Sequence, residues 1–238
     1  MKLSVRLKPS EFYFAQFGLV TIIIGLGLAA HLFTILTGHG NLFGFMRLLN
    51  VDSEQSIPTY FSLLNLLFAS ILLFVIYAYE KNEKTKGSRY WLLMSILFLF
   101  LSFDESAGVH EKFGNIYIYL REQGTIPPTL NAHEWLPFGV AFVIVVAIVL
   151  IPFMRMLNGD TLRNFLIAGG VFVTGAVGIE AIQSAILESA VIDVESSIAY
   201  SFGPLFEESF EMYGIAIFNC ALYREIVRRN ISLSINSR

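Results

Sequence analysis

Four side chains capable of acid–base or metal chemistry stand close together in the segment 104–111. Asp104, Glu105, His110 and Glu111 follow a run, 91–103, that contains no Asp, Glu, Lys, Arg or His. On one continuous helix, at about 100° per residue, Asp104 and Glu111 would lie roughly 20° apart, with Glu105 and His110 on the flanks. Carboxylates with an imidazole beside them are typical of metal sites and of general acid–base catalysis.

Further carboxylates occur on two other apolar segments, at comparable depth. Glu180 ends the apolar stretch 164–180, and Glu207 and Glu211 are one helical turn apart. With a rise of about 1.5 Å per residue, these residues and Asp104 fall at similar heights in their helices. Ionisable residues at membrane depth indicate function. We therefore predict one site shared by three helices, with the candidate ligands Asp104, Glu105, His110, Glu111, Glu180, Glu207, Glu208 and Glu211.

The elements that must position these residues are membrane-spanning helices. The chain has 238 residues, of which 55% are hydrophobic and 15% charged, a composition typical of membrane proteins. Crossing a bilayer takes about 20 apolar residues. Six stretches are long enough, and they are approximately 12–36, 58–79, 90–110, 135–154, 164–186 and 200–223. We predict an all-α fold, a polytopic transmembrane helical bundle of about six spans that forms a single membrane domain over residues 1–238.

The basic residues predict the orientation of the bundle. Thirteen of the 16 Lys and Arg residues lie in the N-terminal segment, the connections 80–90 and 155–163, and the C-terminal tail. Only Arg47, Lys112 and Arg121 lie on the other side, which carries most of the acidic residues. Positive residues mark the cytoplasmic side, so both termini are expected in the cytoplasm. The segment 37–57 alternates apolar and polar residues and predicts a short interfacial helix.

The predicted cluster has almost no cations nearby to neutralise it. Burying an unpaired carboxylate costs roughly several kcal/mol. Protonation, a bound cation or a water-filled pocket would each relieve that cost. Carboxylates with one imidazole suit a divalent metal ion such as Zn, Fe, Mn or Ca. The sequence lacks the paired Glu-x-x-His motifs of di-iron bundles and the His-Glu-x-x-His motif of zinc enzymes, and it has no phosphate-binding loop and no dinucleotide fingerprint.

Four motifs together resemble a family of uncharacterised bacterial multi-pass membrane proteins. They are Ile57-Pro-Thr-Tyr-Phe-Ser62, Asp104-Glu105 with His110-Glu111, Gly175-Ala-Val-Gly-Ile-Glu180, and Glu207-Glu-Ser-Phe-Glu-Met-Tyr-Gly214. The resemblance covers most of the chain from the second span onward. It implies a location in the bacterial cytoplasmic (inner) membrane and implies no activity. The chain is similar to ceramidase-type membrane metal hydrolases only in general plan, because their histidine pattern is missing.

Three functions are compatible with these observations. The first is a metal-dependent enzyme whose site opens toward the outer leaflet and which acts on a lipid or another amphiphile. The second is a proton- or cation-coupled carrier or channel. The inner halves of the helices contain few polar residues, which argues against a continuous pathway for ions. The third is a non-catalytic membrane subunit or sensor. The expected surroundings are the lipid bilayer and either a homo-oligomer or a partner subunit, with no nucleic acid.

Overall fold

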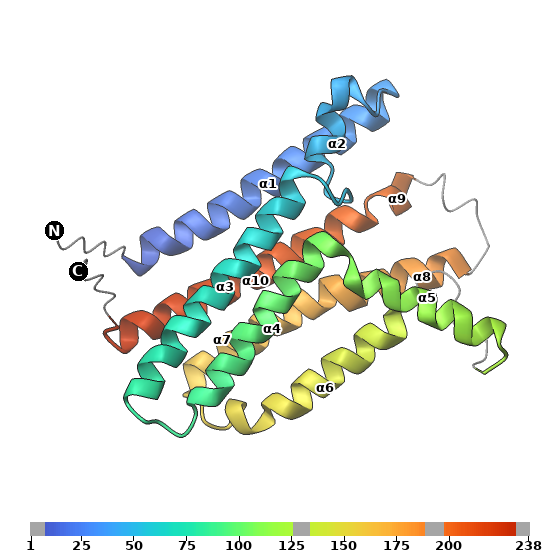
Figure 1. The fold of residues 1–238 in the computed structure, drawn as a ribbon. Coiled ribbons are helices and arrows are strands. Elements are labelled where there is room, and N and C mark those ends of the chain that lie inside the picture. Colours follow the sequence, from blue (N-terminus) through green and yellow to red (C-terminus); the bar gives the residue numbers. More distant parts are fainter. Residues whose placement is uncertain (1–7, 126–133, 189–197, 232–238) are drawn as a thin grey trace, which may run out of the picture.

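The chain folds as a bundle of long helices (Figure 1). The computed structural model describes residues 8–125, 134–188 and 198–231, and within them every regular element is helical. Five helical stretches are long and apolar enough to cross a membrane, which indicates a membrane protein. They are α1 (Pro9–Thr37), α3 (Ile57–Asn82), α4 (Ser88–Ala107), α6 (Leu136–Met154) and the continuous stretch Gly159–Leu187.

The last of these stretches changes its helical form along its length. It begins as α7 (Gly159–Val173), passes through a π-helical turn, η2 (Thr174–Ile179), and continues as α8 (Glu180–Glu188). The remaining elements are η1 (Leu42–Gly44), α2 (Phe45–Leu49), α5 (Val109–Glu122), α9 (Ile198–Ser201) and α10 (Gly203–Arg228). The short helix α2 lies within the segment for which an interfacial helix is predicted.

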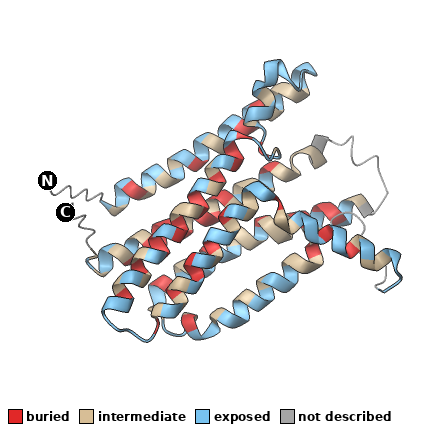
Figure 2. Cartoon of the chain, in the orientation of Figure 1, coloured by how far each residue is buried: buried red, intermediate tan, exposed pale blue. Residues whose placement is uncertain are grey.

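Helix α10 runs through the middle of the bundle, between α1, α3 and the α7–η2 stretch (Figure 1). Many of its residues are buried, and buried positions also concentrate on α3 and α4 (Figure 2). It matches the sixth predicted span in place and length, but its charged residues keep it outside the group of five apolar helices. Helix α6, by contrast, buries only Leu136 and Phe153, as expected for a helix whose surface faces lipid.

The two ends of the bundle differ in chemistry. We call the end that holds the start of α1, the α3–α4 and α6–α7 connections and the end of α10 the basal end, and the other the apical end (Figure 1). The start of α1 meets the end of α10, where the Phe12 and Tyr223 rings stack 4.3 Å apart. The basal half is filled by apolar side chains such as Leu73, Ile76 and Leu222, all fully buried.

One predicted span ends earlier than expected. The third was predicted to run to residue 110, whereas α4 ends at Ala107. Gly108 takes a left-handed conformation (φ 53°, ψ 41°), and its N–H donates to the Asp104 carbonyl oxygen at 2.8 Å. This is how glycine commonly terminates a helix. The chain then turns into α5, so part of the segment between the third and fourth predicted spans is helical.

Candidate functional site

Five glutamates from three helical segments gather at the apical end, inside the bundle. Glu211 of α10 lies within electrostatic reach of four other carboxylates, which come from α4, α8 and α10 itself. We call this group the carboxylate cluster; its members are Glu105, Glu180, Glu207, Glu208 and Glu211. Acidic residues from α4, α8 and α10 therefore lie near one another.

A close approach of two backbones holds the cluster together. The π-helical turn η2 precedes Glu180 and places Gly175 directly against α10. A Cβ atom on Gly175 would lie only 2.7 Å from the Glu207 carbonyl oxygen and 2.9 Å from Glu211 Cγ. Only a glycine therefore lets η2 come so near to the carboxylates. Single π-helical turns within α-helices are frequent at functional sites.

Three members of the cluster have no basic partner in the described residues. Within 8–125, 134–188 and 198–231, no Lys, Arg or His nitrogen lies within ion-pair distance of Glu105, Glu208 or Glu211. Glu207 accepts a hydrogen bond from Gln183 Nε2 at 3.0 Å. The cluster therefore concentrates negative charge in a setting where ionised groups are costly.

The buried acids of the basal end are treated quite differently. Glu225 is 2% exposed, and its carboxylate accepts from Arg228 at 2.7 Å and from Arg229 Nε at 3.1 Å. Arg229 also pairs with the buried Glu80 and lies over the Trp91 ring at 5.3 Å. At the basal end, arginines therefore neutralise the buried acidic side chains. Their scarcity around the apical cluster is a distinguishing feature of that end.

Asp104 and His110 form a hydrogen-bonded pair beside the cluster. The Asp104 carboxylate is 2.8 Å from His110 Nδ1 and accepts the His110 backbone N–H at 2.9 Å. The turn at Gly108 makes this possible, since it folds the start of α5 back over the end of α4. The expected geometry, with Asp104 and Glu111 on one face of a continuous helix, is therefore wrong. Burial lowers the pKa of His110, but the hydrogen bond and charge of Asp104 outweigh it and raise that pKa.

Trp135 connects the histidine with the cluster. Its ring meets the His110 ring edge to face, with centroids 4.8 Å apart, and its Nε1–H donates to Glu180. Its partner lies 45 positions away in the chain. Glu180 is 6% exposed, so this indole bond satisfies part of a deeply buried carboxylate.

Glu111, by contrast, lies on the apical surface rather than within the cluster. Half of its side chain is exposed, and Lys112 Nζ is 4.0 Å away. Glu111 Oε2 and Glu54 Oε1 both lie near the position that a Cβ on Gly108 would occupy, at 3.3 and 3.4 Å. Asp52 lies within electrostatic reach of Glu111 and also of Glu208. A line of acidic groups therefore leads from the surface toward the cluster.

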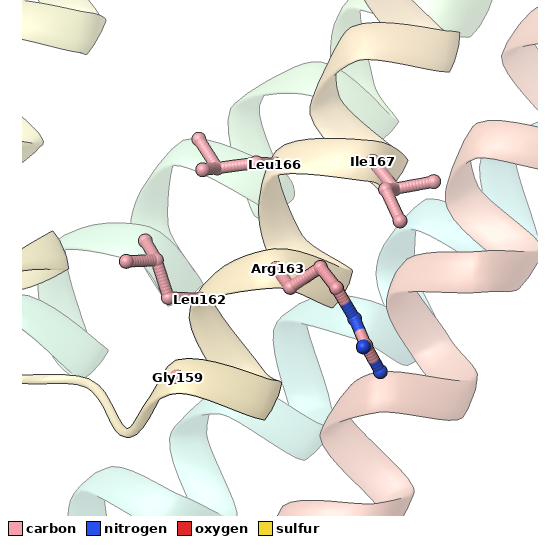
Figure 3. A pocket seen from close by; sticks show the side chains of 5 residues that line it. All are labelled: Gly159, Leu162, Arg163, Leu166 and Ile167. Carbon is pink, nitrogen blue, oxygen red and sulfur yellow. The ribbon is translucent and has the colours of Figure 1, made fainter.

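A small cavity lies at the base of the cluster. Its volume is about 10 Å³, and Glu105 and Glu211 line it together with Ser62 and Asn65 of α3. Apolar side chains complete the wall, namely Leu66, Phe172, Met212 and Ile215. A larger hollow of about 390 Å³ lies near the basal end of α7, around Arg163 and Leu166 (Figure 3). It is remote from every carboxylate of the cluster and contributes nothing to it.

The side chains of the cluster are not arranged as metal ligands. Among the residues that the structure describes, no three His, Cys, Asp or Glu side chains converge closely enough to hold a metal ion. The glutamates reach the cluster through flexible side chains, so coordination would require rotation about their side-chain bonds.

The comparisons with known proteins establish a family. The model of a domain of unknown function, DUF8692, matches residues 17–226. The chain belongs to the DUF8692 family. The matched region runs from α1 to the end of α10 and so includes the carboxylate cluster and the Asp104–His110 pair. No curated protein and no solved structure matches the chain.

Proposed function

We propose that this DUF8692 protein is a metal-dependent enzyme of a bacterial inner membrane, acting from its outer face on a lipid or another amphiphile. The observation that carries the proposal is the Asp104–His110 pair next to carboxylates that have no basic partner among the described residues. A divalent cation would neutralise the cluster, and oxygen ligands suit Mn, Fe, Zn or Ca.

The roles follow from the positions of the residues. Glu105, Glu208 and Glu211 would hold the cation, because they are the carboxylates of the cluster without a basic partner in the described residues. With Nδ1–H donating to Asp104, the neutral imidazole of His110 leaves Nε2 free to accept a proton. A carboxylate that orients a histidine in this way is a common arrangement for general bases and for metal ligands. When bound, the metal would supply an activated water or polarise a carbonyl or phosphoryl oxygen.

The surroundings of the pair favour an amphiphilic substrate. Helix α5 begins at the Asp104–His110 pair and exposes the apolar residues Phe113 and Ile116, while Gly114 and Tyr117 are buried. An amphipathic helix of this kind is suited to the headgroup level of a bilayer. A substrate that lies in the outer leaflet could approach His110 without leaving the membrane.

A carrier is less well supported, because among the described residues apolar side chains fill most of the core between the cavity and the basal end. Phe98 and Phe218 stack at 4.6 Å below the cavity, and Leu73 and Leu222 fill the space toward the basal end. Beyond the cavity, the buried polar side chains of α3 and α4 include Ser70 and Ser95, which hydrogen-bond to each other. A site reached from one side suits binding or catalysis better than transfer across the membrane.

Metal analysis of the purified full chain tests the proposal. We expect about one equivalent of a divalent metal, or binding of added Mn²⁺ or Zn²⁺, and loss of that binding in Glu211→Gln. Glu83→Gln is the matched control, because Glu83 lies in the α3–α4 connection at the basal end. A protein that binds neither ion, or a Glu211→Gln variant that binds them as well as the wild type, would refute the metal site.

Catalysis needs its own experiment. Membranes containing the wild-type protein or His110→Gln would be incubated with labelled bacterial lipids, and the products compared by mass spectrometry. We expect a product that depends on His110 and on added metal, with metal content unchanged in the variant. A metal-binding protein that forms no such product would instead support the role of a subunit or sensor.

We further propose six crossings with both termini in the cytoplasm, which places the carboxylate cluster toward the outer side. The single native cysteine, Cys220, is buried, so single cysteines can be introduced for labelling. In intact cells, a membrane-impermeant maleimide should label Asn41→Cys, in the apical α1–α3 connection, and should spare Lys86→Cys, in the basal α3–α4 connection. The opposite pattern would invert the orientation.

A further inference from the structure

Two polar residues of α3 lie at the base of the carboxylate cluster, and the proposed function does not use them. Asn65 and Ser62 are 6% and 8% exposed, and both line the cavity of about 10 Å³ that Glu105 and Glu211 also line. Among the described residues, Asn65 Nδ2 and Ser62 Oγ have no hydrogen-bond partner. Leaving such buried groups unsatisfied is costly, and native proteins rarely do so.

The orientation of the Asn65 amide follows from its neighbour on α10. Asn219 Nδ2 donates to Asn65 Oδ1 at 2.8 Å and to the Asn65 backbone carbonyl oxygen at 3.2 Å. A carbonyl oxygen can only accept, so Asn219 must present its N–H₂ group to Asn65. The Asn65 side-chain oxygen is therefore engaged with Asn219, and its N–H₂ group remains for another acceptor.

This assignment excludes a cation as the direct partner of Asn65. An N–H donor repels a metal ion and needs an acceptor, and an apolar molecule would leave it unsatisfied. A water molecule meets every requirement, because it can accept from Asn65 and from the Ser62 hydroxyl and donate to Glu105 and Glu211. Buried waters typically make about three hydrogen bonds, and a cavity of roughly 10–15 Å³ can hold one.

We propose that this cavity binds one water molecule, through which Asn65 and Ser62 position the carboxylates of Glu105 and Glu211. The water site itself does not depend on the proposed function. Only its consequence does, namely that α3 helps to hold the metal ligands in place. Asn65 and Ser62 are thus positioning residues. Asn219 acts indirectly, because its hydrogen bond to Asn65 Oδ1 sets the orientation of the Asn65 amide.

A map of the metal-free full chain in lipid nanodiscs, at a resolution that shows waters, tests the proposal directly. We expect density within hydrogen-bond distance of Asn65 Nδ2 and of at least one carboxylate, and its loss in Asn65→Leu, which has similar volume and no donor. Ser62→Ala is a milder second variant if Asn65→Leu does not fold. Absence of density in the wild type, or a side chain that fills the cavity, would overturn the proposal.

The metal-loaded protein gives a second readout. Mn²⁺ affinity should fall about tenfold in Asn65→Leu, the effect of losing roughly one hydrogen bond to a charged group. Ser102→Ala is the matched control, because Ser102 is also buried but donates to the Leu63 carbonyl oxygen and does not line the cavity. Unchanged Mn²⁺ affinity in both Asn65→Leu and Ser62→Ala would refute the positioning role.

The two proposals fail in different ways. If the wild type binds no Mn²⁺, the metal site is refuted, while density at Asn65 still decides whether the water is present. If the density gives an anomalous signal after Mn²⁺ is added, the cavity holds an ion, which overturns the water and supports the metal site.

Discussion

The contact of Gly175 with α10 gives a direct test of how the cluster is built. A methyl group at this position would lie 2.7 Å from the Glu207 carbonyl oxygen, 2.9 Å from Glu211 Cγ and 3.0 Å from Phe210 Cβ. Carbon atoms in ordinary contact are about 3.5–4.0 Å apart. Two of the three obstructing atoms are a backbone oxygen and a Cβ, which cannot rotate away. Gly175→Ala must therefore push η2 and α10 apart.

The expected cost is that of overpacking, about 1–3 kcal/mol. For a chain of this size, about 1 kcal/mol shifts the midpoint of thermal unfolding by about 2–4 °C, so Gly175→Ala should lower it by about 2–12 °C. Gly170→Ala is the matched control, because a Cβ on Gly170 meets nothing within 4 Å. Replacing this helical glycine should stabilise the protein by roughly 0.5–1 kcal/mol.

The assay is thermal unfolding of the detergent-solubilised variants, followed by Mn²⁺ titration. Gly175→Ala should lose stability and also bind Mn²⁺ more weakly, because the displaced segment of α10 carries Glu207 and Glu211. Gly170→Ala should leave Mn²⁺ binding unchanged. Equal midpoints for the two variants would show that η2 does not touch α10 as described, and the geometry of the cluster would have to be revised.

Two further predictions concern the charged pairs. Arg229→Met should destabilise the protein by about 3–5 kcal/mol, since it leaves the buried Glu225 with fewer partners, whereas Arg163→Met, at an exposed pair, should cost about 0–1 kcal/mol in the same thermal assay. Asp104→Asn should lower the pKa of His110, measured by NMR of labelled histidine, because Asp104 raises it in the wild type. Accordingly, the stability that wild-type His110 contributes should be complete below its unfolded pKa of about 6.5 and be lost as the pH rises through its higher folded pKa. An unshifted pKa in Asp104→Asn, or equal losses in the two arginine variants, would contradict these interpretations.

The meeting of the acidic residues could be predicted from sequence because depth in a membrane is a one-dimensional quantity. Counting residues along straight helices places Asp104, Glu180 and Glu211 at one height without any knowledge of how the helices are arranged. Which face each helix turns toward its neighbours is a different matter. It depends on tertiary contacts such as the one at Gly175, which periodicity in a uniformly apolar segment does not reveal.

The Asp104–His110 pair shows the opposite situation, in which a local signal was present. A continuous helix through residues 104–111 separates the two side chains by an angle that prevents contact. Gly108 follows Ala107 at the point where a left-handed residue would end the helix, a common role for glycine. Weighing this glycine as a helix terminus would have brought His110 back onto Asp104. For the bond between Trp135 and Glu180, no local signal exists.

The position of α10 explains why a hydropathy criterion finds five spans while the chain was expected to have six. A long, uniformly apolar helix can face lipid along its whole length, and α6 is such a helix. Helix α10 is surrounded by α1, α3 and α7, so its carboxylates face protein and its sequence need not be uniformly apolar. A helix that carries a buried polar site will fail such a criterion because of the residues that form the site. Among the six predicted spans, the least apolar one, α10, therefore packs against three other spans, α1, α3 and α7.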